Sequence, residues 1–302
     1  MPERDEHIAV YNRYTGSLET ESVYGEKWLR WSYETAAGRL MLNAVIKRAW
    51  FSRWYGWRMS RPGSRRLVQP FVETYGLDET EFADPVTSFR SFNDFFSREL
   101  RSGARPIDPD PASIVFPADG RHLGFPSIGS QDRIYAKGQS LNLHELLDDS
   151  ELARRFAGGA VVISRLCPVD YHRFHMPCAG VLSEPRSIPG PLFSVSPIAL
   201  RSQVGFLAEN KRAVSLIRET VCGTVAMVEV GATCVGTIIQ TAPPGWVAKG
   251  VEKGMFRFGG SCVITLFEPK RVKLSDDLAT ESARGYEIFA RMGDRLGMAQ
   301  VV

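Results

Sequence analysis

The stretch FRFGGSCVITLF, residues 256–267, places a serine directly after two glycines and before a run of residues that favour β-strands. Ser261 is therefore expected at the start of a strand. A hydrolase nucleophile elbow runs strand, turn, helix, and has a glycine two positions after the serine, where this chain has Val263. Ordinary serine-hydrolase chemistry is thus disfavoured, although a Ser or Cys hydrolase stays an alternative.

The paired glycines permit a different reaction, in which the Ser261 hydroxyl folds back on the carbonyl of Gly260. Attack there would convert the peptide bond into an ester, and elimination followed by loss of ammonia would leave a pyruvoyl group on the new amino terminus. This chemistry needs a general base, for which a histidine oriented by an aspartate is the usual solution. A glycine bulge at a strand start is the other interpretation of these residues.

Two of the five histidines lie in the run CPVDYHRFHMP, residues 167–177, between prolines that disfavour a regular helix. In an extended chain Asp170 and His172 share one face and His175 points to the other. The run could offer two imidazoles to one pocket, but a zinc site would lack a motif for its third ligand, so we expect no metal. Asp119 lies in an Asp-Gly pair, where a turn residue is the simplest interpretation.

The composition is that of an ordinary globular chain. It has 302 residues, 44% hydrophobic and 24% charged, with a net charge of +3, which excludes disordered, collagen-like and disulfide-framework proteins. Five cysteines without a Cys-x-x-Cys pair favour a reducing compartment. The first residues resemble no secretory signal, and no apolar run reaches the roughly 18 residues of a spanning helix. We therefore expect a cytoplasmic protein.

Residues 27–66 have apolar side chains at helical spacing, and they include five of the six tryptophans and ten Lys or Arg against one glutamate. Tryptophans with basic side chains suit a helix that lies in an anionic headgroup layer. A helical subdomain with an aromatic core fits the pattern equally well, whereas nucleic-acid binding has no supporting motif. Residues 88–101 suggest another amphipathic helix, and residues 105–111 a linker.

Beyond the linker the sequence changes to short β-type runs separated by glycine and proline turns. Strands are expected at 160–164, 224–230, 234–240 and 262–267, a helix at 141–156, and a closing helix or mobile end at 275–297. The predicted fold class is α+β. A largely antiparallel β catalytic domain over 105–302 follows an N-terminal helical, membrane-facing region over 1–104.

Taken together, these segments resemble the phosphatidylserine decarboxylase proenzymes over most of the chain. The similar blocks follow in family order: PADG at 117–120, DYHRFHMP at 170–177, PGPLFSV at 189–195, NKR at 210–212, VEVGA at 228–232 and KGVEKGMF at 249–256. The segments 11–16, 23–26 and 91–98 are similar to the branch with an extra helical region.

The resemblance implies a pyruvoyl-dependent carboxy-lyase that converts phosphatidylserine to phosphatidylethanolamine and CO2 through a Schiff base. By the same resemblance, Ser261 becomes the pyruvoyl group after cleavage between Gly260 and Ser261. His175 with Asp119 activates it, Asp170 is a second candidate partner, and His172 acts in decarboxylation.

The resemblance also suggests partners and a location. The long and short cleaved chains would stay together as a heterodimer, and a homodimer is possible. The protein would act as a peripheral membrane protein on the anionic cytoplasmic face, without nucleic acid. Cys262 departs from the Ser or Thr that commonly follows the family's cleaved serine, so a processing-deficient lipid-binding homologue is a further alternative.

Overall fold

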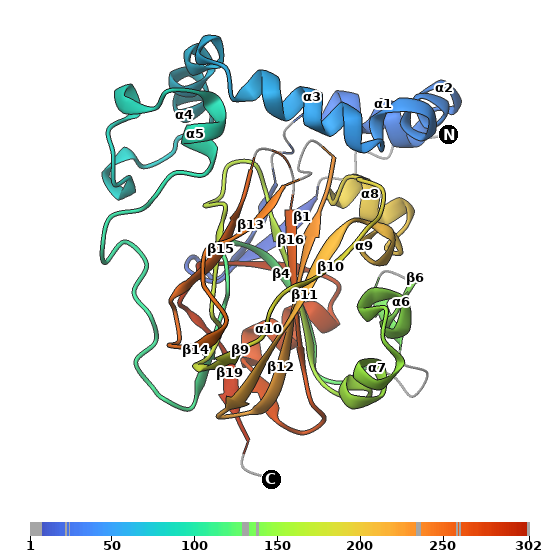
Figure 1. Cartoon of the computed structure of the whole chain (residues 1–302), viewed down its shortest axis with the longest axis vertical. Coiled ribbons are helices and arrows are strands. Elements are labelled where there is room, and N and C mark those ends of the chain that lie inside the picture. Colours follow the sequence, from blue (N-terminus) through green and yellow to red (C-terminus); the bar gives the residue numbers. More distant parts are fainter. Residues whose placement is uncertain are drawn as a thin grey trace.

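The computed structural model describes residues 8–21, 23, 25–128, 133–136, 139–233, 237–257, 259 and 261–300. Its centre is an eleven-stranded sheet with the order β14-β9-β11-β12-β16-β7-β4-β18-β1-β2, in which β10 also pairs with β11 (Figure 1). The strands are β1 Ala9–Asn12, β2 Ser17–Thr20, β4 Gly120–Phe125, β7 Val161–Leu166, β9 Gly180–Leu182, β10 Arg186–Ile188, β11 Arg212–Thr220, β12 Gly223–Gly231, β14 Gly245–Val247, β16 Ser261–Phe267 and β18 Glu287–Ala290. Every described pairing in it is antiparallel except the parallel pair β1–β18.

Both faces of the main sheet are buried, so its strands carry apolar residues at successive positions. Along β16, Val263 and Phe267 belong to one hydrophobic cluster, whereas Cys262, Ile264 and Leu266 belong to another. The alternation follows from the two-residue period of a strand. Side chains of β16 therefore reach two different environments, and Ser261 shares the face of Val263.

The face that carries Val263 is covered by a three-stranded sheet of the order β13-β15-β8, formed by Ile238–Gln240, Glu252–Phe256 and Arg173–His175. Another three-stranded sheet has the order β17-β19-β3, from Val272–Leu274, Arg295–Ala299 and Ser113–Val115, and β5 Arg133–Ala136 pairs with β6 Gln139–Asn142. Helices cover the opposite face: α6 Leu143–Leu147, α7 Ser150–Phe156 and α9 Phe206–Glu209. The sheet β13-β15-β8 matters most, because its strand β8 ends with His175.

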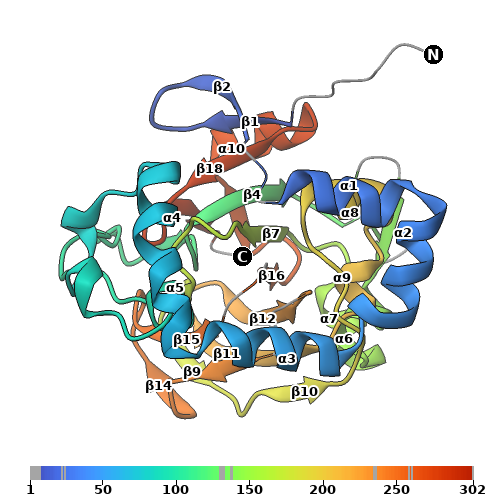
Figure 2. The same ribbon diagram turned by 90° about the horizontal axis from the view of Figure 1, so that it is seen from above.

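The N-terminal helices lie across one end of the sheets (Figures 1 and 2). They are α1 Glu26–Glu34, α2 Ala36–Met41, a π-helix Leu42–Ile46, α3 Ala49–Met59, a 3-10 helix Pro62–Leu67, α4 Val68–Tyr75 and α5 Phe92–Phe96. Short helical segments elsewhere are 3-10 turns at Glu79–Glu81 and Val86–Ser88, with α8 Pro197–Ser202 and α10 Asp276–Ala283.

The long helix expected over 27–66 is divided into pieces by local backbone signals. Thr35 is extended and caps α2 by accepting a hydrogen bond from the Gly38 N–H, and Arg48 is extended just before α3. Pro62 begins the 3-10 helix, where a missing N–H is tolerated. The apolar spacing predicted helix correctly, but the caps divide it.

Three other expectations are corrected. Of the helix expected over 88–101, only α5 forms, starting at the Ser91 cap. The helix expected over 141–156 is broken at Asp148, which has a φ of 49°, and α7 restarts after the Asp149 cap. The tail expected as a closing helix or mobile end continues beyond α10 into β18 and β19.

The expected helical region over 1–104 also begins with strands, because the hairpin of β1 and β2 joins the main sheet through β18. Among the strands expected, 160–164, 224–230 and 262–267 are present as β7, β12 and β16, and β13 covers the end of 234–240, whose first three residues lie outside the described part.

The tryptophans of the helical layer, by which we mean the N-terminal helices from α1 to α5, are not its core. All five expose 40 to 56% of their surface: Trp28, Trp31, Trp50, Trp54 and Trp57. No helix in the described part of the chain is both long and apolar enough to cross a bilayer.

Candidate active site

Ser261 opens β16 and is paired on both sides, with Gly231 of β12 and Leu166 of β7. Its side chain is fully buried, and its Oγ has no hydrogen-bond partner among the described residues. Gly259, two residues earlier, has a φ of 132°, which an L side chain rarely adopts, so glycine is needed there. Gly260, the other side of the expected cleavage point, lies outside the described residues. A buried hydroxyl left without a partner points to a functional role.

His172 lies in the turn between β7 and β8 and is fully buried. Its Nδ1 is 3.0 Å from the carbonyl oxygen of Asp170, so Nδ1 is the protonated nitrogen of the neutral ring and donates to that oxygen. Nε2 has no partner in the described part of the chain. Burial, aided by the charge of Arg98, lowers the pKa of His172 to about 3, although the main chains of Asp170 and Gly259 oppose the shift. His172 is therefore neutral near pH 7 and lies beside the segment that precedes Ser261.

His175 ends β8 and is held by its main chain. Its N–H donates to the Pro117 carbonyl at 2.7 Å, and it is paired with Glu252 of β15. Burial lowers the pKa of His175 to about 4; Glu252 and the Pro117 main chain oppose the shift, and Arg173 adds to it. Its Nδ1 is buried and has no partner among the described residues. A neutral imidazole at this position can accept a proton.

The two aspartates of the sequence hypothesis are both buried and both bound to arginines. Arg105 contacts the carboxylate of Asp119 through Nε and Nη2 at 2.9 and 2.7 Å, and the Met292 N–H donates to it at 2.8 Å. Burial raises the pKa of Asp119, and the pairing with Arg105 opposes that shift. Asp170 lies 2.6 Å from Arg121 Nη1 through both oxygens.

Neither carboxylate is hydrogen-bonded to a histidine among the described residues. Asp170 instead closes the turn of the histidine segment, because the Cys167 N–H donates to its Oδ2 at 2.7 Å. Asp119 lies two residues after Pro117, and the Pro117 carbonyl accepts a hydrogen bond from the His175 N–H. Asp119 therefore lies at the same end of the sheets as His175. Main-chain hydrogen bonds thus join His172 to Phe256, in the segment that leads to Ser261, and His175 to Pro117, while Asp170 has a structural contact. Among the described residues, no hydrogen bond joins the Ser261 side chain to a histidine or to Asp119.

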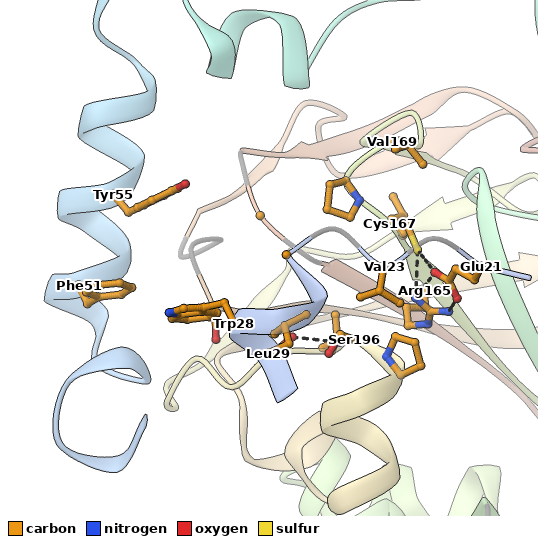
Figure 3. Close-up of a pocket in the computed structure, with 18 of the residues that line it drawn as sticks. Glu21, Val23, Trp28, Leu29, Phe51, Tyr55, Arg165, Cys167, Val169 and Ser196 are labelled. Atoms are coloured by element: carbon orange, nitrogen blue, oxygen red, sulfur yellow. Dashed lines mark hydrogen bonds and ion pairs between the residues drawn. The ribbon is translucent and has the colours of Figure 1, made fainter. Parts of the chain in front are cut away.

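A pocket of about 400 Å³ adjoins this end of the sheets and reaches Gly259. One side is polar: Cys167 donates to Glu21 at 2.7 Å, and Arg165 pairs with Glu21 at 2.7 Å. Aromatic residues of α1 and α3 face this group across the pocket, as Figure 3 shows for Trp28, Phe51 and Tyr55. The pocket can therefore accommodate a molecule with one polar and one apolar part.

Sequence reasoning missed Phe96, Arg98 and Arg105, which contact the histidine segment or Asp119. The block at 91–98 was singled out, but nothing in its spacing indicates what it touches. Within the described residues, no three side chains of His, Cys, Asp or Glu gather as a metal site requires.

Comparisons with known proteins agree with one another. The profile of the family described as Phosphatidylserine decarboxylase matches residues 92–298. A protein from Fusobacterium nucleatum is 41% identical over 293 residues, covering 97% of this chain and 98% of its own. One from Chlamydia muridarum is 44% identical over 95% of both chains, and one from Clostridium kluyveri is 39% identical over 96% of this chain and 99% of its own. Each of the three is named Phosphatidylserine decarboxylase proenzyme.

Proposed function

The chain belongs to the phosphatidylserine decarboxylase family, and from this premise we propose that it is a proenzyme that cuts itself before Ser261. Its reaction is the decarboxylation of phosphatidylserine to phosphatidylethanolamine with release of CO2, a carboxy-lyase activity. Three buried atoms without partners in the described residues carry the proposal: Ser261 Oγ, His172 Nε2 and His175 Nδ1. Ser215 Oγ and Thr265 Oγ1 also lack a partner among the described residues, so the three atoms support the proposal together with their places in the segments that resemble the family.

In the self-cleavage step the neutral His175 ring accepts the Ser261 hydroxyl proton while Oγ bonds to the Gly260 carbonyl carbon. The C–N bond then breaks, His175 passes the proton to the Ser261 nitrogen, and an ester is left. Loss of the Ser261 α-proton breaks the Cβ–O bond, which frees the Gly260 carboxylate and leaves a dehydroalanine. Its imine tautomer reacts with water, releases ammonia and becomes a pyruvoyl group. Asp119 supports His175 in this step, with Arg105 holding its carboxylate in place.

The pyruvoyl group supplies a carbonyl that condenses with the substrate amine and accepts the electron pair left by CO2, which no ordinary side chain can do. His172 moves the protons. Its Nε2 is unprotonated near pH 7, so it can take a proton from the substrate ammonium group and return it to the α-carbon after CO2 leaves. Its Nδ1 stays bonded to the Asp170 carbonyl throughout.

The pocket beside Gly259 fits a lipid whose headgroup reaches the polar side and whose apolar part lies along α1 and α3. Exposed tryptophans on α1 and α3 and the basic residues around them favour docking on an anionic membrane surface. The protein would then act as a peripheral protein on the cytoplasmic face, with the acyl chains left in the bilayer.

The two products of cleavage would remain one folded unit. The short chain, residues 261–302, holds β16 between β12 and β7 and also contributes β18 to the main sheet. Cutting before Ser261 breaks none of these pairings. A heterodimer of the long and short chains is therefore expected.

The rival functions lack support from the site. Cys262 points to the opposite face of the sheet from Ser261 and packs in the other hydrophobic cluster, so its thiol does not crowd the attacking hydroxyl. A serine hydrolase would need a helix after Ser261, where β16 lies instead.

The test is intact mass spectrometry with a carbonyl-reactive label on the purified full chain and on Ser261→Ala. We expect the parent to give residues 1–260 and 261–302, with the label on the short piece, and the variant to stay whole. Ser215→Ala is the matched control, because Ser215 is also a buried main-sheet serine without a side-chain partner in the described residues. It should cleave like the parent. A parent that stays continuous and unlabelled contradicts the proposal.

A further inference from the structure

The end of α5 packs directly on the histidine segment, although more than 70 residues separate them in the chain. Three consecutive residues make the contact. The Phe96 ring lies 3.8 Å from the His172 ring, centroid to centroid. The Ser97 carbonyl accepts hydrogen bonds from Arg173 Nε and Nη2 at 3.1 and 2.9 Å. Arg98 Nη2 donates to the Val169 carbonyl at 3.2 Å.

Arg98 is the unusual member of this group, because its guanidinium is buried without a carboxylate. Only 5% of the residue is exposed, Nε and Nη1 have no hydrogen-bond partner among the described residues, and no Asp or Glu of the described chain lies within ion-pair distance. Burial lowers the pKa of Arg98 to about 10, and the more distant charges of Asp119 and Asp170 oppose that shift. The guanidinium carbon lies 4.9 Å from the Phe82 ring centroid and 4.8 Å from that of Phe95. Burying an unpaired charge is costly, so the contacts that it does make need an explanation.

Those contacts converge on the peptide units that orient His172. Arg98 Nη2 also reaches the Asp170 carbonyl at 3.5 Å, and this same oxygen accepts the His172 Nδ1–H at 3.0 Å. One carbonyl thus links the guanidinium to the imidazole. Phe96 packs against the His172 ring, and Arg98 holds the Asp170 carbonyl, which sets the rotation and the tautomer of that ring. The two contacts together keep Nε2 of His172 pointing in one direction.

We propose that residues 96–98 form a positioning element for His172, with Arg98 as its central residue, and that this element serves decarboxylation but not self-cleavage. The inference rests on the proposed function, in which His172 acts in turnover and His175 in cleavage. His175 is held separately, through Pro117 and β15, and Asp119 is held by Arg105. Loss of the Arg98 contacts should therefore loosen one histidine and leave the other in place.

The experiment compares Arg98→Met and Arg98→Lys with the parent, as full chains, in a phosphatidylserine–detergent assay for CO2. Methionine keeps an apolar stem between the two phenylalanines but loses both carbonyl contacts. We expect Arg98→Met to be cleaved as completely as the parent, with kcat lower by roughly 100-fold, the loss that a misplacement of about 1 Å can cause, and KM within about twofold. Arg98→Lys keeps one donor and should recover part of kcat.

Arg101→Met is the matched control, because Arg101 is exposed and the one hydrogen bond that its side chain donates within the described chain goes to the Phe82 carbonyl. The variant should keep parental cleavage and kcat. Cleavage is read by mass, separately from turnover. An uncut parent would overturn the proposed function, whereas a cut and active parent matched by an equally active Arg98→Met would overturn only this inference. If Arg98→Met does not fold, the Arg98→Lys variant provides the test. A parental kcat in Arg98→Lys would contradict a role specific to His172, and so would a loss of cleavage as large as the loss of turnover.

Discussion

The helical layer and the sheets differ in which side chains they expose and which they bury. The helical layer exposes tryptophans to solvent at its surface, whereas the sheets bury Lys253, Glu229 and both segment histidines almost completely. A protein that only needed stability would do the reverse, with aromatic rings inside and charges outside. In the proposed function this contrast corresponds to a division of labour, in which the sheets hold the chemistry and the helices meet the lipid.

The two parts touch at the pocket and at the end of α5. The pocket takes its aromatic side from α1 and α3 and its polar side from the loops around β7. If the division is real, changes in the sheets should affect reaction or stability whatever the form of the substrate. Changes of exposed side chains on the helical layer, away from the end of α5, should matter only when the substrate is in a membrane.

The largest effect is expected from substituting the two segment histidines one at a time. His175→Ala removes the base for self-cleavage, so the chain should stay uncut and inactive. His172→Ala should be fully cut but lose turnover by roughly 10²–10⁴-fold, the usual contribution of a positioned acid–base group. Mass spectrometry measures the cut and CO2 release measures turnover. An uncut His172→Ala would mean that one histidine cannot be assigned to each step.

The next effect concerns the buried charges of the sheets. Lys253 Nζ lies 2.8 Å from both Glu229 Oε1 and Gln240 Oε1, and the Lys253 and Glu229 side chains have no exposed surface. This pair joins β15, which carries the partner of His175, to β12 beside β16. Lys253→Met leaves Glu229 buried and unpaired, so unfolding should become easier by about 3–5 kcal/mol.

Urea unfolding measures this loss. Lys273→Met is the matched control, because Lys273 forms an exposed pair with Asp276, whose loss should cost less than about 1 kcal/mol. Adding Glu229→Met to Lys253→Met should recover most of the stability, since both charges are then gone. Equal effects of the buried and exposed single variants would contradict the contrast between the two environments.

The four runs expected as strands in the catalytic domain do contain strands, because apolar β-type runs buried on both faces leave few other options, but most strands of the domain, β4 and β11 among them, were not predicted. Ser261 was expected to begin a strand and does begin β16. The helix expected over 27–66 was only partly right, since periodicity reports the buried side of a helix and not where Thr35 or Arg48 interrupts it.

The partners of the candidate site were harder to predict. Asp170 was proposed beside a histidine, but its carboxylate binds Arg121, which lies 49 residues away in the chain. Arg98 contacts Val169 across 71 residues. Contacts of this kind depend on how separate elements pack, which neither spacing nor composition records. The resemblance to a known family could name residues, but it could not show what holds them.

The pH dependence of stability tests the burial of His172. Its folded pKa is about 3, below the value of about 6.5 in an unfolded chain. Unfolding therefore takes up a proton between these values. The stability from keeping the ring neutral is complete above pH 6.5 and is lost as pH falls toward 3. Between pH 6 and 5 this residue should account for up to about 1.4 kcal/mol per pH unit.

Urea unfolding at several pH values from 5 to 7 gives the slope of the free energy of unfolding against pH for the parent and for His172→Asn. The variant should lose less stability per pH unit, while His122 and His175, whose pKa values are also lowered by burial, keep contributing. Identical slopes would mean that His172 is not held neutral in the folded protein.

The smallest effect should come from the helical layer, and it should depend on the lipid. Arg66 is exposed in the 3-10 helix that follows α3. Each basic side chain near an anionic surface contributes about 1 kcal/mol, so Arg66→Gln should bind phosphatidylserine vesicles roughly fivefold more weakly. Turnover of a short-chain phosphatidylserine dissolved as monomers should not change.

Co-sedimentation with vesicles measures the binding, and neutral phosphatidylcholine vesicles should show no difference between parent and variant. Arg154→Gln serves as the matched control, because Arg154 is also exposed but lies on α7, away from the helical layer (Figure 1). A fivefold loss in both variants would indicate a general effect of net charge. A loss of vesicle binding confined to Arg66→Gln would locate the lipid surface on the helices. An equal loss of turnover with the dissolved substrate would contradict the proposed division between the two parts.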